Sequence, residues 1–217
     1  MNCCGKIICS GCIHAFQSRA TKKEHDVCPF CRTPPVSTNG EMIKRYEKRI
    51  KLNDANAFTN MGCFYDQGQK GLPQNFAKAF ELFHRAGELG SADAYYDIGN
   101  VFKFGEGGVE VDEKKAIHYW ELAAMMGCVD ARHNLGVMEG MADNYNRALK
   151  HFMIAARYGH GNSLTGIKLI YKNGDATKDE YTKALRSYQA YLDEIKSDQR
   201  DQAAASDDGR YYESALL

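Results

Sequence analysis

The chain has 217 residues, 28 acidic and 28 basic side chains and a hydrophobic fraction of 44%, so its formal net charge is zero. This balance does not favour nucleic acid as a partner, and no apolar run approaches the roughly 18 residues that a membrane-spanning helix needs. The N-terminus also lacks the apolar core of a signal peptide, because Cys9 directly follows Ile7 and Ile8. We therefore expect a cytoplasmic or nuclear protein that binds neither a membrane nor nucleic acid. In that reducing setting, cysteines are metal ligands or buried thiols rather than disulfides.

Six of the eight cysteines lie within the first 31 positions, and they include two C-x-x-C pairs with 15 residues between them. A C-x-x-C loop can turn both thiolates toward one tetrahedral metal ion, and Zn²⁺ suits such soft ligands in a segment with little core. The spacing therefore predicts bound zinc as the cofactor. The candidate ligands are Cys3, Cys4, Cys9, Cys12, Cys28 and Cys31.

The run from Cys4 to Cys12, together with Cys28-Pro29-Phe30-Cys31-Arg32, resembles the last three quarters of a RING finger. That family holds two zinc ions in a cross-braced pattern and recruits a ubiquitin-conjugating enzyme. The resemblance makes Cys9 and Cys12 the third ligand pair, and Cys28 and Cys31 the fourth. It also implies that Pro29 and Arg32 contact the conjugating enzyme.

The first ligand pair of that family has no counterpart here, and Lys6 stands where the second pair usually has a histidine. We therefore expect a finger truncated at its N-terminus, in which Cys3, next to Cys4, takes the place of that histidine. The alternative is a single zinc site closed by the two C-x-x-C pairs. Likewise, Pro29 can be a rigid turn former and Arg32 a solvated side chain.

Residues 34–40 are rich in turn formers, which predicts a domain boundary. Residues 41–52 then read as one amphipathic helix, with Met42, Ile43, Tyr46 and Ile50 on one face. The predicted organisation is a partial RING-type finger over 1–35, a linker and helix over 36–52, helical repeats over 53–197 and a flexible tail over 198–217.

The repeats follow from a phrase that occurs three times. Asn60-Met61-Gly62 returns as Asp97-Ile98-Gly99 and as Asn134-Leu135-Gly136, 37 residues apart each time (62 to 99 to 136). A period in this range indicates stacked helical hairpins. Gly90, Gly127 and Gly159 are expected to end the second helix of each hairpin.

These hairpins resemble the Sel-one-like repeats, relatives of the tetratricopeptide repeats. The match is fullest in the second unit, through its Gly-x-Gly loop, Asp112-x-x-Lys115-Ala116-x-x-x-Trp120 and a final Ala-Ala-x-x-Gly. It implies an all-α fold: an α-solenoid of three to four helix-turn-helix repeats, preceded by the small zinc-binding RING-like module. The expected units are about 53–90, 91–127, 128–160 and 161–197. The fourth is degenerate and has a capping box at Thr177 to Glu180.

In this family the first helices line a concave groove that binds peptides or proteins. The period aligns polar side chains of these helices into a row, so we expect the row to hold a protein partner and to favour basic ones. A merely solvated helix face is the alternative. The predicted groove residues are Asn56, Asn60, Gln67, Asp93, Asp97, Asp130 and Asn134.

No serine, histidine and carboxylate set or phosphate-binding loop indicates covalent catalysis, so no catalytic residue is predicted. Cys63 and Cys128 are expected to be buried small side chains, and the histidines at 84, 118, 133, 151 and 160 to lie at the surface. Two functions of different class remain. One is a ubiquitin-ligase-like protein that binds its substrate through the repeats. The other is a non-catalytic adaptor whose zinc module is structural.

Overall fold

The computed structural model describes residues 12, 13, 15, 16 and 27–198. Cys3, Cys4 and Cys9 lie outside these residues. Contacts divide the chain into two compact parts, residues 53–194 and residues 1–52 with 195–217. Within the described ranges every regular element is a helix, and no helix there is both long and apolar enough to cross a membrane.

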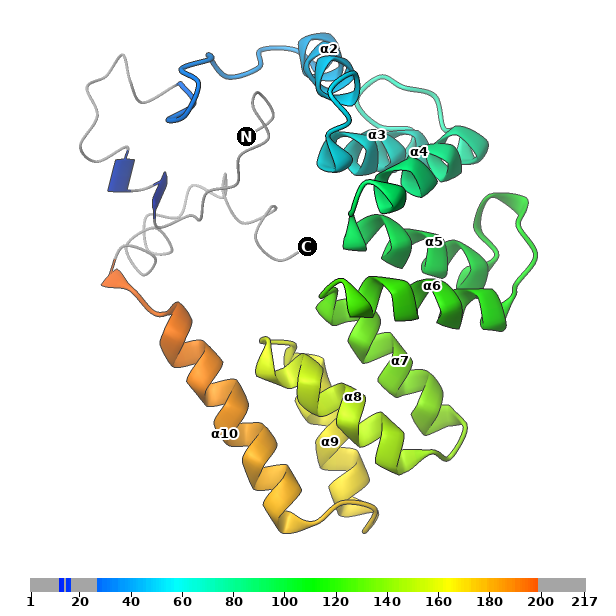
Figure 1. Ribbon diagram of the computed structural model, residues 1–217, viewed down its shortest axis with the longest axis vertical. Coiled ribbons are helices and arrows are strands. Elements are labelled where there is room, and N and C mark those ends of the chain that lie inside the picture. Colours follow the sequence, from blue (N-terminus) through cyan, green and yellow to red (C-terminus); the bar gives the residue numbers. More distant parts are fainter. Residues whose placement is uncertain (1–11, 14, 17–26, 199–217) are drawn as a thin grey trace. The chain divides into compact units, whose positions relative to one another are not determined.

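The part over 53–194 is a run of helical hairpins in which each helix from α3 to α8 packs on the next (Figure 1). The predicted all-α repeat solenoid is therefore confirmed. The helices are α3 (Ala55–Gln67) with α4 (Phe76–Glu88), α5 (Ala92–Phe104) with α6 (Glu113–Met125), α7 (Val129–Met141) with α8 (Tyr145–Arg157), and α9 (Gly161–Lys172) with α10 (Lys178–Ile195).

The first helix of each repeat begins at a side-chain cap that obeys the same 37-residue period. Asp54, Ser91 and Cys128 accept hydrogen bonds from the backbone N–H three residues later. Each bond satisfies one of the N–H groups that a helix start leaves without a partner. At the other end of each hairpin, Gly90 and Gly127 both have φ of 97°, a conformation that favours glycine, so the predicted stops are confirmed.

The glycine of the repeated phrase is the place where the two helices of a hairpin meet. A Cβ added to Gly62 would lie 2.6 Å from the Phe83 ring, and one added to Gly136 would lie 2.7 Å from the Phe152 ring. Trp120 covers Gly99 in the same way. A side chain at these positions would displace the aromatic ring that fills the hairpin core, because protein interiors are close-packed.

The glycine-rich loop between α5 and α6 is expected from its sequence to have no helical conformation. The structure has one 3-10 turn there, η1 (Glu106–Gly108). Gly107 interrupts the turn with a φ of 65°. The two left-handed glycines at 107 and 108 explain why the turn stops after one cycle.

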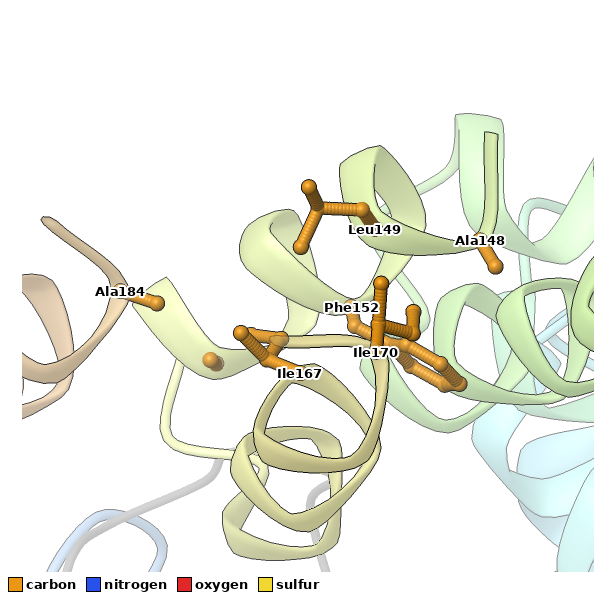
Figure 2. Packing of buried hydrophobic residues seen from close by; sticks show 7 residues of the cluster. Ala148, Leu149, Phe152, Ile167, Ile170 and Ala184 are labelled. Atoms are coloured by element: carbon orange, nitrogen blue, oxygen red, sulfur yellow. The ribbon is translucent and has the colours of Figure 1, made fainter. Parts of the chain in front are cut away.

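The fourth hairpin joins the third through a shared apolar cluster that includes Phe152, Ile167, Ile170 and Ala184 (Figure 2). Its second helix, α10, begins with the predicted capping box. Glu180 N–H donates to Thr177 Oγ1 at 3.2 Å, and Thr177 N–H donates to the Glu180 carboxylate at 2.8 Å. The fourth hairpin therefore packs around buried apolar side chains, although its sequence departs from the repeat.

In the other compact part, α2 (Asn39–Ile50) begins two residues earlier than the predicted helix. Thr38 caps it, and the Ser37 hydroxyl and N–H both donate to the Glu41 carboxylate at 3.1 Å. This reciprocal cap explains the earlier start. Met42 and Tyr46 are buried, and Ile43 and Ile50 are half-buried.

Candidate functional site

The polar row lies at fixed positions of the first helices. Asn56, Asp93 and Asp130 are the second residues of α3, α5 and α7. One turn later, the sixth residues are Asn60, Asp97 and Asn134. Gln67 differs, because it ends α3 and the period maps it onto Phe104 and Met141.

The carboxylates of this row interact with one another through space. Burial, and then the charges of Asp93, Asp66 and Glu106, raise the pKa of Asp97 to about 7. Burial, and then the charge of Asp130, raise the pKa of Asp93. We call these five residues, from α3, α5, η1 and α7, the acidic cluster: Asp66, Asp93, Asp97, Glu106 and Asp130.

Two members of the acidic cluster, Asp66 and Glu106, are not predicted from the sequence. Asp66 has Lys103 one period later, and Glu106 belongs to a loop, so repetition gives no signal for either. Both residues line a cavity of about 190 Å³ whose other walls include Phe80 and Phe83. Burial raises the pKa of both carboxyls. The cavity thus combines an apolar wall with two carboxylates.

Polar side chains connect neighbouring helices along this face. The Thr59 and Ser91 hydroxyl oxygens lie 2.9 Å apart and join α3 to the cap of α5. The Cys63 thiol donates to Asp97 Oδ2 at 3.9 Å. Burial, followed by the charges of Asp97 and Asp66, raises the pKa of Cys63 to about 12. This thiol is therefore protonated at neutral pH and is not a nucleophile.

The asparagines of the row have different surroundings. Asn60 Nδ2 donates to the Asn56 carbonyl one turn earlier at 2.7 Å, so its amide is held along α3. Burial raises the pKa of Tyr96 of α5, and the side chains of Asn100 and Asn134 lower it. Asn56 is exposed, whereas Asn60 and Asn134 are half-buried.

The expectation that the five histidines lie at the surface holds for His118 alone, because the other four are half-buried. His133 and His160 pack against each other. Their rings stack with centroids 4.2 Å apart, and both Nδ1 atoms approach the buried Ser163 hydroxyl, at 3.0 and 2.9 Å. His160 Nε2 lies 3.3 Å from Asp130 Oδ1, and His160 Nδ1 also caps α9. The pair occupies the same positions as Thr59 and Ser91, the fifth residue of a first helix and the cap of the next first helix.

The predicted zinc module is described only in part. Cys28 N–H donates to the Thr33 carbonyl and Arg32 N–H donates to the Cys28 carbonyl, both at 2.9 Å, so the second C-x-x-C loop is a closed turn. Cys28 is buried, while Cys12 and Cys31 are exposed. Pro29 is half-buried within the turn, and Arg32 is exposed with a φ of 58°. Among the described residues, no three His, Cys, Asp or Glu side chains are grouped to hold a metal ion.

The helical hairpins match a known repeat family. The Sel1 repeat matches residues 57–91, 92–128 and 129–160. Residues 57–160 are therefore a run of three Sel1 repeats, the kind of repeat that the sequence resembles. No match was found among curated proteins.

A solved structure of a Sel1 repeat protein has the same fold. A Sel1 repeat protein from Oxalobacter formigenes superposes with a TM-score of 0.60 at 20% identity, over 89% of this chain and 75% of its own. MamA aligns with a TM-score of 0.41 at 20% identity, over 77% of this chain and 91% of its own. An immunity protein from Pseudomonas aeruginosa aligns with a TM-score of 0.38 at 15% identity, over 96% and 88%. The first of these likenesses shows the fold alone.

Proposed function

We propose that this protein is an interaction scaffold that binds a basic segment of a protein partner along the first helices of its Sel1 repeats. The acidic cluster is the observation that supports this function. Its carboxylates come from successive repeats, and burial together with their mutual repulsion raises the pKa of Asp97 to about 7. Repulsion of this kind disfavours the empty charged state.

A cationic side chain from a partner would relieve that repulsion and form charge-assisted hydrogen bonds with the carboxylates. The cavity beside Asp66 and Glu106 offers Phe80 and Phe83 as an apolar wall. The aliphatic stem of a lysine or arginine can pack on such a wall while its charged end meets the carboxylates. Lysine and arginine are therefore the side chains that this surface suits.

The test is binding of a fluorescent oligolysine peptide to the full chain, followed by anisotropy. We expect the double variant Asp93→Asn with Asp97→Asn to bind roughly tenfold more weakly, because two ion pairs are lost. The matched control is Asp175→Asn, which removes an exposed charge outside the acidic cluster. Added salt should weaken binding to the unmodified chain. Equal affinity of the double variant and the control would exclude the acidic cluster as the binding surface.

We further infer that the N-terminal cysteines form a RING-type zinc module, which would give the scaffold a ubiquitin-ligase-like role. The closed turn at Cys28 supports this proposal, since it presents Cys31 and Arg32 just after Pro29. Bound zinc would tie this turn to the cysteines at 3, 4, 9 and 12, and its role would be structural. Ubiquitin transfer would then depend on positioning rather than on a covalent catalyst in this chain.

Zinc content tests the metal proposal. We expect about one tightly bound zinc per purified chain, lost when Cys28 and Cys31 are both replaced by serine. The matched control is Cys63→Ser in the repeats, which should keep the metal. Two full equivalents per chain would contradict the expected partial finger.

Capture of a ubiquitin-charged conjugating enzyme separates the two functions. The ligase-like role predicts capture that Arg32→Ala weakens without loss of zinc. A zinc-loaded chain that captures no conjugating enzyme would instead be the adaptor, with a structural zinc module.

A further inference from the structure

A groove of about 420 Å³ lies between the second and third repeats, where the ends of α6 and α8 meet the start of α7. Its walls include Ala124, Cys128, Arg132, Ile154 and Tyr158. Ile154 is 43% exposed and Tyr158 is 58% exposed, so both side chains are accessible to a partner. The groove contains no residue of the acidic cluster.

At each of the two neighbouring boundaries, a tyrosine of the chain itself covers a glycine near the end of the second helix. Tyr95 lies over Gly87 so closely that a Cβ there would be 2.5 Å from its ring. Gly87 is one period before Ala124, and Tyr95 is one period before Arg132. Between the third and fourth hairpins, Tyr191 covers Gly159, the counterpart of Gly127. The middle boundary has arginine where the first has tyrosine, and there the groove remains open.

The polar edge of the groove is cationic. Arg132 donates one hydrogen bond, to the Ala124 carbonyl at 2.9 Å, and forms no ion pair within the described part of the chain. Arg157 lies 5.9 Å from the Tyr158 ring centroid and likewise has no carboxylate partner there. The charge of Arg132 adds to burial in lowering the pKa of His151. An incoming carboxylate would therefore meet two uncompensated guanidinium groups.

We propose that this groove binds an aromatic side chain of a protein partner that has a carboxylate beside it. The size and apolar lining suit an aromatic ring, as the tyrosines of the neighbouring boundaries illustrate. Arg132 and Arg157 supply the charge complementarity for the carboxylate. This partner segment is acidic and aromatic, so it differs from the basic segment proposed for the acidic cluster.

The probes for this groove are two small phenols of opposite charge, 4-hydroxyphenylacetate and tyramine. Each is titrated into the full chain while the methyl signals of Ile154 and Met126 are followed by NMR. We expect 4-hydroxyphenylacetate to shift these signals in a saturable way and to bind roughly two- to fivefold more tightly than tyramine, because exposed ion pairs are weak. Equal affinities, or shifts that never saturate, would overturn the proposal.

Two variants locate the effect at Arg132. The double variant Arg132→Tyr with Ala124→Gly reproduces the pair found one period earlier, Tyr95 over Gly87, and should fill the groove, which abolishes binding of both probes. Arg132→Gln keeps the groove open and should make the two affinities equal. Lys172→Tyr, at an exposed position of α9, is the matched control.

The variants also distinguish this proposal from competing explanations. The double variant Arg132→Tyr with Ala124→Gly should leave oligolysine binding at the acidic cluster unchanged, so the two surfaces fail or survive separately. Undiminished probe binding by this double variant in its folded state would place the probe elsewhere. Concentration-dependent self-association that this variant abolishes would mean that a second copy, rather than another protein, occupies the groove.

Discussion

At the scale of single residues, one glycine per repeat determines how closely the two helices of a hairpin approach. Gly62, Gly99 and Gly136 each lie under an aromatic ring of the second helix. Their backbone is helical, and most other residues favour a helix more than glycine does. Close packing against the ring, rather than backbone conformation, is therefore the reason for glycine at these positions.

We expect Gly99→Ala to destabilise the protein by roughly 1–3 kcal/mol, because the new methyl group would displace the Trp120 ring from a filled core. Gly140→Ala is the matched control, since a Cβ there lies 3.8 Å from its nearest neighbour, Ala148. That change should stabilise α7 by about 0.5–1 kcal/mol. Urea denaturation of both variants measures the difference. Equal effects of the two substitutions would be incompatible with the packing role of Gly99.

The pKa of Asp97 predicts how stability depends on pH. Its folded-state pKa of about 7 lies above its ordinary value of 3.8, so the folded chain retains a proton that the unfolded chain has lost. Between these values the free energy of unfolding falls as pH rises, by at most roughly 1.4 kcal/mol per pH unit from this group. Asp97→Asn should therefore be stabilising at pH 8 and nearly neutral at pH 4. Urea denaturation at both pH values tests this, and a gain of equal size at pH 4 would count against it.

At the scale of helices, repetition in the sequence predicts the hairpins well, because every repeat uses equivalent caps and equivalent small residues. The caps at Asp54, Ser91 and Cys128 show that the period extends even to the residue before the helix. Contacts that depend on a departure from the period could not be predicted. Glu106 lies in a loop, so the period gives no signal for its place beside Asp66.

The histidine pair joins the third repeat to the fourth hairpin and should make that joint sensitive to acid. Burial, and then the charge of His160, lower the pKa of His133 from 6.5 to about 4. Because the unfolded chain binds a proton first, stability falls as pH drops from about 6.5 toward 4, by at most roughly 2 kcal/mol at pH 5.

His133→Phe keeps an aromatic ring beside His160 and Phe152 but cannot titrate. We expect it to remove part of the loss of stability between pH 7 and pH 5, measured by denaturant unfolding at each pH. His118→Phe, at an exposed position of α6, is the control and should leave the pH profile unchanged. An identical pH profile for His133→Phe and the original chain would disprove the role of the pair.

At the scale of the whole molecule, each hairpin packs mainly on its neighbours in the chain, as expected for a repeat protein. A defect at one end should therefore remain local. Ala184 of α10 is 1% exposed and packs in the cluster with Ile167 and Ile170. We expect Ala184→Asp to bury an uncompensated charge and to open the fourth hairpin.

Amide hydrogen exchange measures how far that opening extends. Amides of α9 and α10 should exchange faster in Ala184→Asp, whereas those of α3 to α6 should keep their protection. Ala190→Asp, at an exposed position of the same helix, should change neither set. Loss of protection throughout the repeats would indicate one cooperative unit instead of locally coupled hairpins.

The measurement that tests the proposed scaffold function most directly is NMR mapping of oligolysine on the full chain. The predicted result is a set of amide shifts in α3, α5 and α7 around the acidic cluster, abolished when Asn60, Asp97 and Asn134 are together replaced by alanine in a chain of unchanged helicity. Shifts confined to α4, α6 and α8, or shifts that persist in the folded triple variant, would contradict binding on the first helices.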